Sequence, residues 1–330
     1  MTWDPYNPDP AYPPQPGGAG GVPPGGYLPP PQFGPQTVDP LVSPDYSGWW
    51  GRATTIVRHG WKPLATIQAL GLVLSLLLQA PVGIYVAFAS DDLQRAFPEP
   101  GTTSGQADLT PFFVALGLGV GAALLGVLVT SMVTLAVVHV GASVAIGAPV
   151  RIDDALRLAA RRIFPLIGWQ LLTIPIYLVG LCLCVLPVFY VAAVFAVLPV
   201  VVAAERTGAV GRCFTLFHRN LGVSAGRLAT ILGLTLAVGL IGAVFSGIIE
   251  AGTSAGSSTA ATVVGVVVST LISAALSGAL AILVAPLTLT AYADMRARTE
   301  PFNAMVIAQE LGIVQPQSPW SEPWPPAAAT

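Results

Sequence analysis

The chain has 330 residues, of which 54% are hydrophobic and only 9% are charged, and its mean hydropathy is +0.72. Soluble domains carry roughly 25% charged residues, so this composition excludes an ordinary soluble protein and predicts an integral membrane protein. The formal net charge of -2 provides no clustered basic surplus. We therefore expect no nucleic-acid partner, because phosphate binding needs such a surplus.

The two ends of the chain differ in composition from the middle. Residues 1–45 contain fourteen prolines, many glycines and no Lys or Arg. A segment of this kind cannot bury a core, so it predicts a disordered tail. It also lacks the basic and apolar regions of a secretory signal peptide, and we expect the tail to be retained. Residues 315–330 predict a second Pro-rich tail, which leaves residues 46–314 as the membrane domain.

Six apolar segments are long enough to cross a bilayer, which takes about 20 helical residues. The second segment exceeds one membrane thickness, so it should tilt or project from the membrane and carry His139 to a buried position. The third and fourth are continuous in sequence, and a tight hairpin is expected near Leu186-Pro187. The predicted fold is thus an all-α bundle of six transmembrane helices. The segments are residues 64–88, 112–148, 163–204 (two spans), 228–249 and 262–291.

The positions of the cations predict the orientation of this bundle. With six spans, thirteen of the fourteen Lys and Arg residues fall on one side of the membrane, and only Arg95, in the loop 91–110, falls on the other. Cytoplasmic loops carry the excess of Lys and Arg. We therefore expect a multi-pass protein of the plasma membrane with both termini in the cytoplasm.

Three basic amphipathic segments precede the first, third and fifth spans. Residues 47–64 mix Trp with basic side chains, and residues 152–164 begin with two acids and end with two arginines. Residues 207–220 repeat the pattern, with apolar side chains at helical spacing. Such segments are typical of helices that lie in the membrane interface. The order of one amphipathic helix and two spans, found three times, predicts a threefold internal repeat.

The stretch Tyr292-Ala-Asp-Met-Arg-Ala-Arg298 follows the last apolar segment. On a helix, Asp294 and Arg298 are four residues apart with the acid first, which is the favourable order for an ion pair. The stretch should end the sixth span and anchor it at the interface. Asp294 is also a candidate to hold the basic segments together, by pairing with Arg162 or Arg219.

Residues that would support catalysis are sparse. The histidines His59, His139 and His218 lie in different segments, and the three cysteines follow neither a disulfide nor a zinc pattern. None of the common hydrolase, metalloprotease or nucleotide-binding motifs is present. We expect no enzyme activity and no cofactor or metal.

Two functions remain open. The first is a non-catalytic scaffold or accessory module, whose basic belt contacts anionic membrane lipids or another membrane protein. The belt comprises Trp61, Lys62, Arg161, Arg162, Arg212, Arg219 and Arg227.

The second is a transporter or channel for a small solute or lipid. Its candidate lining consists of uncharged polar residues within the spans, although the small-residue spacings Gly117-x-x-x-Gly121 and Ala274-x-x-x-Gly278 also fit plain helix packing. The polar positions are Ser75, Gln79, Thr130, Ser131, Thr134, Gln170, Thr173, Tyr177, Ser269, Thr270, Ser273 and Ser277.

Three motifs in this order resemble those of a known family: residues 161–169 (RRIFPLIGW), residues 205–212 (ERTGAVGR) and residues 292–298 (YADMRAR). With a Pro-rich amino terminus and six spans, the chain resembles actinobacterial membrane proteins grouped with the glycerophosphoryl diester phosphodiesterase membrane domain. The resemblance covers about residues 48–312. It implies the membrane part only, because this chain has no room for the catalytic barrel of roughly 250 residues that accompanies such domains in other members.

Overall fold

A computed structural model describes residues 39–89, 109–183, 185–205, 208–219, 221–254 and 259–314. Within these residues the regular structure is helical, and no strand is found there. The predicted tails 1–38 and 315–330, and most of the loop 91–110 that contains Arg95, lie outside the described residues. Orientation in the membrane therefore stays a prediction.

Within the described residues, six stretches of helix are long and apolar enough to cross a membrane, and one of them comprises α5 and α6 together. These candidate spans overlap the six segments predicted from hydropathy, so the protein is an all-α, multi-pass integral membrane protein. The helices are α1 (Tyr46–Phe88), α3 (Thr110–Ala145), α4 (Ile152–Leu183), α5 (Val185–Phe195), α6 (Leu198–Ala204), α7 (Ala209–Arg219), α8 (Leu221–Ser254), α9 (Thr259–Ala297) and α10 (Ala304–Glu310).

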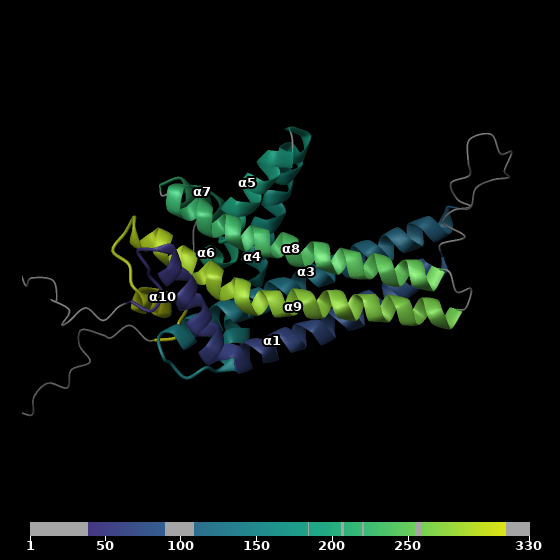
Figure 1. Ribbon diagram of the computed structural model, residues 1–330, viewed down its shortest axis with the longest axis horizontal. Helices are drawn as coiled ribbons and strands as arrows, with labels where there is room; N and C mark the ends of the chain where they lie inside the picture. Colours follow the sequence, from purple (N-terminus) through teal and green to yellow (C-terminus); the bar gives the residue numbers. More distant parts are fainter. Residues whose placement is uncertain are drawn as a thin grey trace, which may run out of the picture. The chain divides into compact units, whose positions relative to one another are not determined.

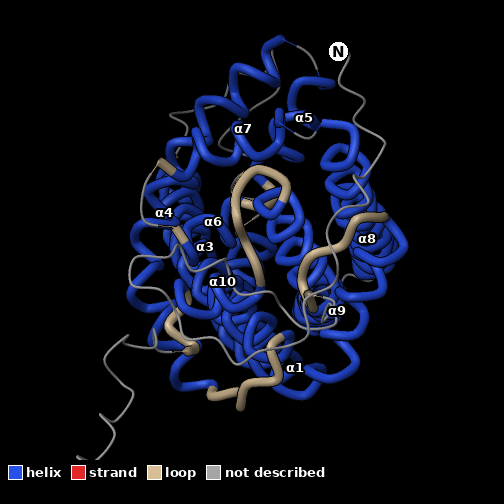
Figure 2. Tube along the Cα trace, turned by 90° about the vertical axis from the view of Figure 1, so that its left-hand side faces the viewer, coloured by secondary structure: helices blue, strands red, loops and turns tan. Residues whose placement is uncertain are grey.

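Four long helices, α1, α3, α8 and α9, form the centre of the bundle. Helix α9 packs against α1 and α8, and α3 packs against α1 and α4 (Figure 1). The short helix α6 contacts α3, α4, α7 and α9. In the view of Figure 2, α6 and α10 lie in the middle with α1, α4, α8 and α9 around them. We use the term charged end for the end of the bundle that contains α6, α7, α10 and the last turns of α9, because most of the ion pairs described below lie there.

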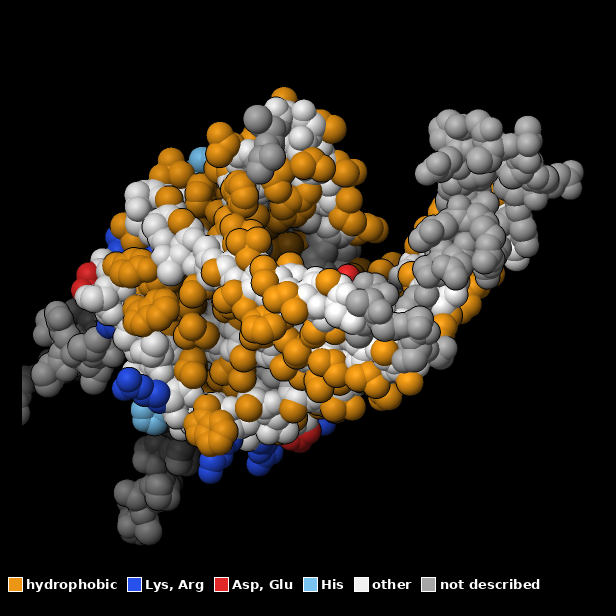
Figure 3. All heavy atoms as spheres, turned by 45° about the vertical axis from the view of Figure 1, so that its right-hand side comes forward, with side chains coloured by type: hydrophobic (Ala, Val, Ile, Leu, Met, Phe, Trp, Pro, Cys, Tyr) orange, Lys and Arg blue, Asp and Glu red, His pale blue; other side chains and the backbone are white. Residues whose placement is uncertain are grey.

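The buried core is concentrated at the charged end. All of α6 except Pro199 is buried, as are the last turns of α3 and the stretch 287–295 of α9. The remaining lengths of the spans expose large apolar side chains, such as Leu77 and Leu124. Hydrophobic side chains cover most of the described helices on the face shown in Figure 3. This outward-facing apolar surface is what a bilayer requires of a spanning helix.

Two amphipathic segments are continuous with the spans that follow them. The first is the start of α1, where Pro63 is accommodated inside the helix, and the second is the start of α4, which contains Pro165. The third segment is α7, and residue 220, which follows it and precedes α8, lies outside the described residues. Span four is divided instead: α5 ends at Phe195, and Pro199 lies in the first turn of α6, a position where proline favours a new helix. The threefold order of these units is present, while a structural repeat stays a prediction.

The close helix crossings differ from those predicted. A Cβ added at Gly71 of α1 would lie 2.6 Å from Val133 of α3, so glycine is needed where these two helices cross. By contrast, a Cβ at Gly117, Gly121 or Gly278 would meet nothing within 4 Å. Of the two alternatives left open for these spacings, close helix packing is therefore not found at these three glycines, and Gly278 lines a cavity.

Residues 39–45, which precede α1, contact distant parts of the membrane domain. Leu41 is fully buried, and the Asp39 side chain accepts hydrogen bonds from Leu41 N and from Ala304 N of α10, each at 2.8 Å. Residues 39–45, which we call the strap, thus join the start of α1 to α10. These contacts join residues far apart in the chain, so the composition of the strap gave no indication of them.

Candidate functional site

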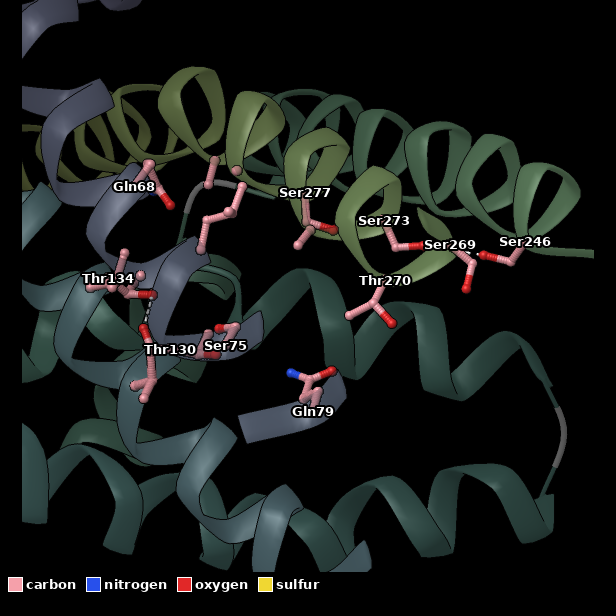
Figure 4. A pocket seen from close by; sticks show the side chains of 17 residues that line it. Gln68, Ser75, Gln79, Thr130, Thr134, Ser246, Ser269, Thr270, Ser273 and Ser277 are labelled. Carbon is pink, nitrogen blue, oxygen red and sulfur yellow. Dashed lines mark hydrogen bonds between the residues drawn. The ribbon is translucent and has the colours of Figure 1, made fainter. Parts of the chain in front are cut away.

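A polar cavity lies among four spanning helices. Side chains from α1, α3, α8 and α9 line a volume of about 510 Å³, and many of them are hydroxyls or amides (Figure 4). A volume of this size falls within the range of about 300 to 1,000 Å³ that is usual for ligand sites. The labelled polar residues are Gln68, Ser75, Gln79, Thr130, Thr134, Ser246, Ser269, Thr270, Ser273 and Ser277.

Some of these hydroxyls are bonded to protein atoms. Thr134 donates to the Thr130 carbonyl at 2.7 Å, and Thr270 donates to the Val266 carbonyl at 2.7 Å, one turn earlier on its own helix. The Ser246 and Ser273 hydroxyls join α8 to α9 at 3.2 Å. These bonds satisfy hydroxyl groups that would be costly to place within a membrane without a hydrogen-bond partner.

Other side chains keep their hydrogen-bonding capacity. Within the described residues, the side chains of Gln68, Ser75, Gln79 and Ser277 make no hydrogen bond to protein atoms. In Figure 4, Gln79 and Ser277 lie on opposite sides of the cavity, on α1 and α9. Amide and hydroxyl groups can both donate and accept, so this lining can bind an uncharged polar molecule.

A second cavity, which we call the groove, adjoins the first. It has a volume of about 770 Å³ and lies among α1, α3 and α4, with a mostly apolar lining. Gln79 and Thr130 line both cavities. At one side of the groove, the Ser131 hydroxyl donates to Gln170 Oε1 at 3.1 Å and so links α3 to α4. Ten of the twelve uncharged polar residues predicted from sequence thus line these two adjoining cavities. The other two do not: Thr173 is buried, and the Tyr177 ring packs against Phe195.

Asp294 is the centre of a buried ion cluster at the charged end. Its Oδ2 atom pairs with Arg227 of α8 and accepts from Arg298 Nε at 2.9 Å. Asp294 and Arg227 are each 1% exposed. Arg227 also donates to the carbonyls of Ser43 and Asp45 at 3.2 and 3.1 Å, and in this way the strap, α8 and α9 are held together.

The structure therefore revises the predicted role of Arg227. The sequence placed it in the belt that faces lipid headgroups, whereas it is buried and paired. The predicted pair Asp294–Arg298 is present, but the partner from another helix is Arg227, where Arg162 or Arg219 was expected. Arg227 lies in the second turn of α8, beside the buried Leu228, and no local feature of the sequence marks it as buried.

A second ion cluster surrounds Tyr292 and Arg296 at the end of α9. The buried Tyr292 hydroxyl donates to Glu205 Oε1 at 2.7 Å. Arg296 binds both carboxylate oxygens of Glu310 in α10, at 2.6 and 2.7 Å, and its guanidinium lies 4.9 Å from the Phe302 ring centre. A two-pronged contact of this kind is among the stronger charged hydrogen bonds. It joins α9 to α10.

Arg212 of α7 belongs to this second cluster. Its Nε atom lies 2.8 Å from Glu205 Oε2, and its Nη2 atom pairs with Glu300. Burial disfavours the charged form of Arg212, but the hydrogen bonds to Glu300 and Glu205 outweigh this effect and raise its pKa. Arg212 is thus engaged with protein carboxylates, which differs from the headgroup-facing role predicted for it.

The other belt residues remain at the surface. Trp61, Lys62, Arg161 and Arg219 are exposed, and Arg162 is partly exposed. The Lys62 ammonium lies 5.9 Å from the centre of the Trp61 ring. These five residues keep the charge and the aromatic surface that contact with lipid headgroups would use.

The isolated histidines and cysteines gather into no metal site. Within the described part of the chain, no group of three or more His, Cys, Asp and Glu side chains is placed to hold a metal ion. Burial of His139 is confirmed, since 5% of it is exposed. Cys213 is fully buried, and this burial raises the pKa of its thiol to about 12.

Comparisons with protein-family models, with curated proteins and with solved structures gave no match to this chain. The resemblance to the glycerophosphoryl diester phosphodiesterase membrane domain rests on its three short motifs. What the structure supports is a multi-pass helical membrane protein with six candidate spans, a polar cavity between four of them, and a network of ion pairs at one end.

Proposed function

We propose that the protein is of the transporter or channel type, and that it binds an uncharged polar molecule in the cavity among α1, α3, α8 and α9. The observation that supports this proposal is the convergence of hydroxyl and amide side chains from four apolar helices on one cavity. Hydrogen-bonding groups that line a membrane cavity are the usual means of selecting an uncharged solute. The proposal assigns no chemical conversion to the protein.

The absence of charge in the lining indicates the class of ligand. Among the described residues, none that lines the cavity is Lys, Arg, His, Asp or Glu. An ion within the membrane would need a paired charge or an ordered set of dipoles, because an unpaired charge there is costly. A neutral ligand with hydroxyl or amide groups can instead exchange hydrogen bonds with Gln68, Ser75, Gln79 and Ser277.

Protection of an introduced thiol tests this binding. In a variant whose native cysteines are replaced by alanine, Ser277→Cys should react with N-ethylmaleimide, and a polyol such as glycerol or erythritol should slow the reaction in a concentration-dependent way. Met305→Cys, on the exposed surface of α10 outside the spans, is the control and should react at a rate that polyols do not change. A Ser277→Cys thiol that never reacts, or that no uncharged solute protects, would contradict the proposal.

The scaffold function is a second candidate, and the exposed belt residues favour it. Trp61, Lys62, Arg161 and Arg219 remain available to headgroups, and each cation near an anionic surface contributes on the order of 1 kcal/mol. Arg161→Gln together with Arg219→Gln should therefore lower the number of phosphatidylglycerol molecules retained in native mass spectrometry. Arg157→Gln, another exposed cation of α4, is the control for charge alone. Equal retention by the double variant and the wild type would contradict this candidate.

A further inference from the structure

The polar cavity and the groove meet at two side chains. Gln79 of α1 and Thr130 of α3 contribute to the lining of both, and Figure 4 shows both directed toward the space between the helices. A Cβ added at Gly126 would lie 3.9 Å from Gln79 Nε2, so the amide group lies beside the groove. A single molecule can therefore reach from the hydroxyl-rich cavity into the apolar groove by passing these two side chains.

The groove has the composition of a site for hydrocarbon. Its α3 side consists largely of small residues, and a Cβ at Gly119 would meet nothing within 4 Å, so α4 does not close onto this face. Its α4 side carries Ile167, Leu171 and Ile174, and Leu171 is 65% exposed. Small residues opposite branched or long apolar residues leave a channel that an acyl chain fits.

From this geometry we infer that the ligand is a lipid with an uncharged, hydroxyl-bearing headgroup, which occupies the polar cavity while an acyl chain lies in the groove. The inference rests on the proposed function and names its substrate class. In the part of the chain that the structure describes, neither cavity has an ionisable side chain in its lining. A phosphate or carboxylate headgroup would have no counter-charge there, so phospholipids and fatty-acid anions should be excluded.

The headgroup should supply the selectivity. Acyl chains are already in hydrocarbon within the bilayer, so moving one into the groove provides no hydrophobic driving force. Hydrogen bonds to Gln79, Ser75 and Ser277 distinguish this lipid from the bulk. Replacing one of these side chains by an apolar residue should weaken binding by roughly 3- to 20-fold, the range that single hydrogen bonds within membranes produce.

Photo-crosslinking with two matched lipids tests the inference. The full-length protein is placed in phosphatidylcholine nanodiscs that contain dioleoylglycerol with a diazirine midway along one chain, or phosphatidylglycerol with the same labelled chain. The diacylglycerol probe should concentrate its crosslinks on residues 119–127 of α3 and 167–174 of α4, several-fold above the phosphatidylglycerol probe. Ser277→Leu and Gln79→Leu should each remove this enrichment, and Val268→Leu should leave it unchanged.

The outcomes separate this inference from the proposed function. If both probes gave crosslinks spread evenly over the lipid-facing helices, the lipid assignment would be overturned. Polyol protection of Ser277→Cys in the same preparation would then still support the proposed function. If neither polyols nor dioleoylglycerol protects Ser277→Cys, both are overturned. Because Ser277→Leu could disturb folding, its thermal unfolding is compared with that of the wild type, and Gln79→Leu provides an independent variant.

Discussion

The buried pair between Arg227 and Asp294 gives a sharp test of what stabilises the charged end. Asp294 pairs with two arginines in different environments: the Arg227 side chain is 2% exposed, and the Arg298 side chain is 30% exposed and lies four residues away on the same helix. Replacing either arginine by glutamine removes one of the two positive charges that lie beside the Asp294 carboxylate. The two variants therefore compare a buried contact between helices with a partly exposed contact within one helix.

The expected magnitudes differ several-fold. Arg227→Gln removes the ion pair to Asp294, the hydrogen bonds to two strap carbonyls, and the contact of the guanidinium with the Trp49 ring at 5.7 Å. Breaking a buried pair by removing one partner costs about 3 to 5 kcal/mol, because the remaining charge is left poorly compensated. Arg298→Gln removes a pair of the i, i+4 type, for which about 0.3 to 0.5 kcal/mol is expected. It also removes one exposed hydrogen bond, from Arg298 to the Pro44 carbonyl of the strap at 3.0 Å.

Unfolding in mixed detergent micelles, followed by circular dichroism as the fraction of denaturing detergent rises, measures both differences. The unfolding midpoint of Arg227→Gln should fall well below that of Arg298→Gln. An Asp294→Asn variant should resemble Arg227→Gln, because it leaves Arg227 buried without its counter-charge. If the two arginine variants agree within about 0.5 kcal/mol, burial does not set the strength of this contact and the reasoning is refuted.

Three further predictions concern other parts of the molecule. Gly71→Ala should lower the unfolding midpoint, because its Cβ would lie 2.6 Å from Val133, whereas Gly119→Ala, with nothing within 4 Å, should leave it unchanged in the same measurement. Burial raises the pKa of Glu300, but its contacts with Arg212 and Arg296 lower it by more, so the net change is a decrease. The ionised Glu300 therefore stabilises the fold above the unfolded-state pKa, and this contribution is lost as pH falls through the folded-state pKa. Glu300→Gln should flatten the acid side of a curve of unfolding midpoint against pH, and an unchanged curve would argue against this. With the other two cysteines replaced, Cys213 should react with maleimide at pH 8 far more slowly than a free thiol, since its pKa is about 12, and fast labelling in the folded state would contradict its burial.

The ion clusters show where prediction from sequence stopped. The pair Asp294–Arg298 followed from helical spacing, because i, i+4 geometry is fixed by the helix itself. The pair Arg227–Asp294 joins residues 67 positions apart, and nothing in the local pattern of α8 distinguishes an arginine that faces headgroups from one that faces α9. Glu205, which lies between Tyr292 and Arg212, was likewise assigned no partner from the sequence.

The cavity likewise combines features that the sequence showed with features that only the structure decided. The polar residues of the spans were all visible in the sequence, but their spacing along single helices fitted packing as well as a lining. The glycines expected to bring helices together meet nothing within 4 Å at Gly117, Gly121 and Gly278, while the close crossing occurs at Gly71. A small residue allows two helices to come close together but does not force them to do so. Whether they do depends on how contacts elsewhere hold the whole helices.

The sequence by itself determined that this is a six-span, all-α membrane protein, because hydropathy and helix length are properties of contiguous residues and the bilayer imposes the same length on every span. It also identified which side chains were available for binding and for ion pairs. Only the tertiary structure decided which of them meet: the strap with α8 and α10, Arg227 with Asp294, and hydroxyls from four helices around one cavity. These contacts join distant parts of the chain, and their energies depend on burial, which arises only when the helices pack.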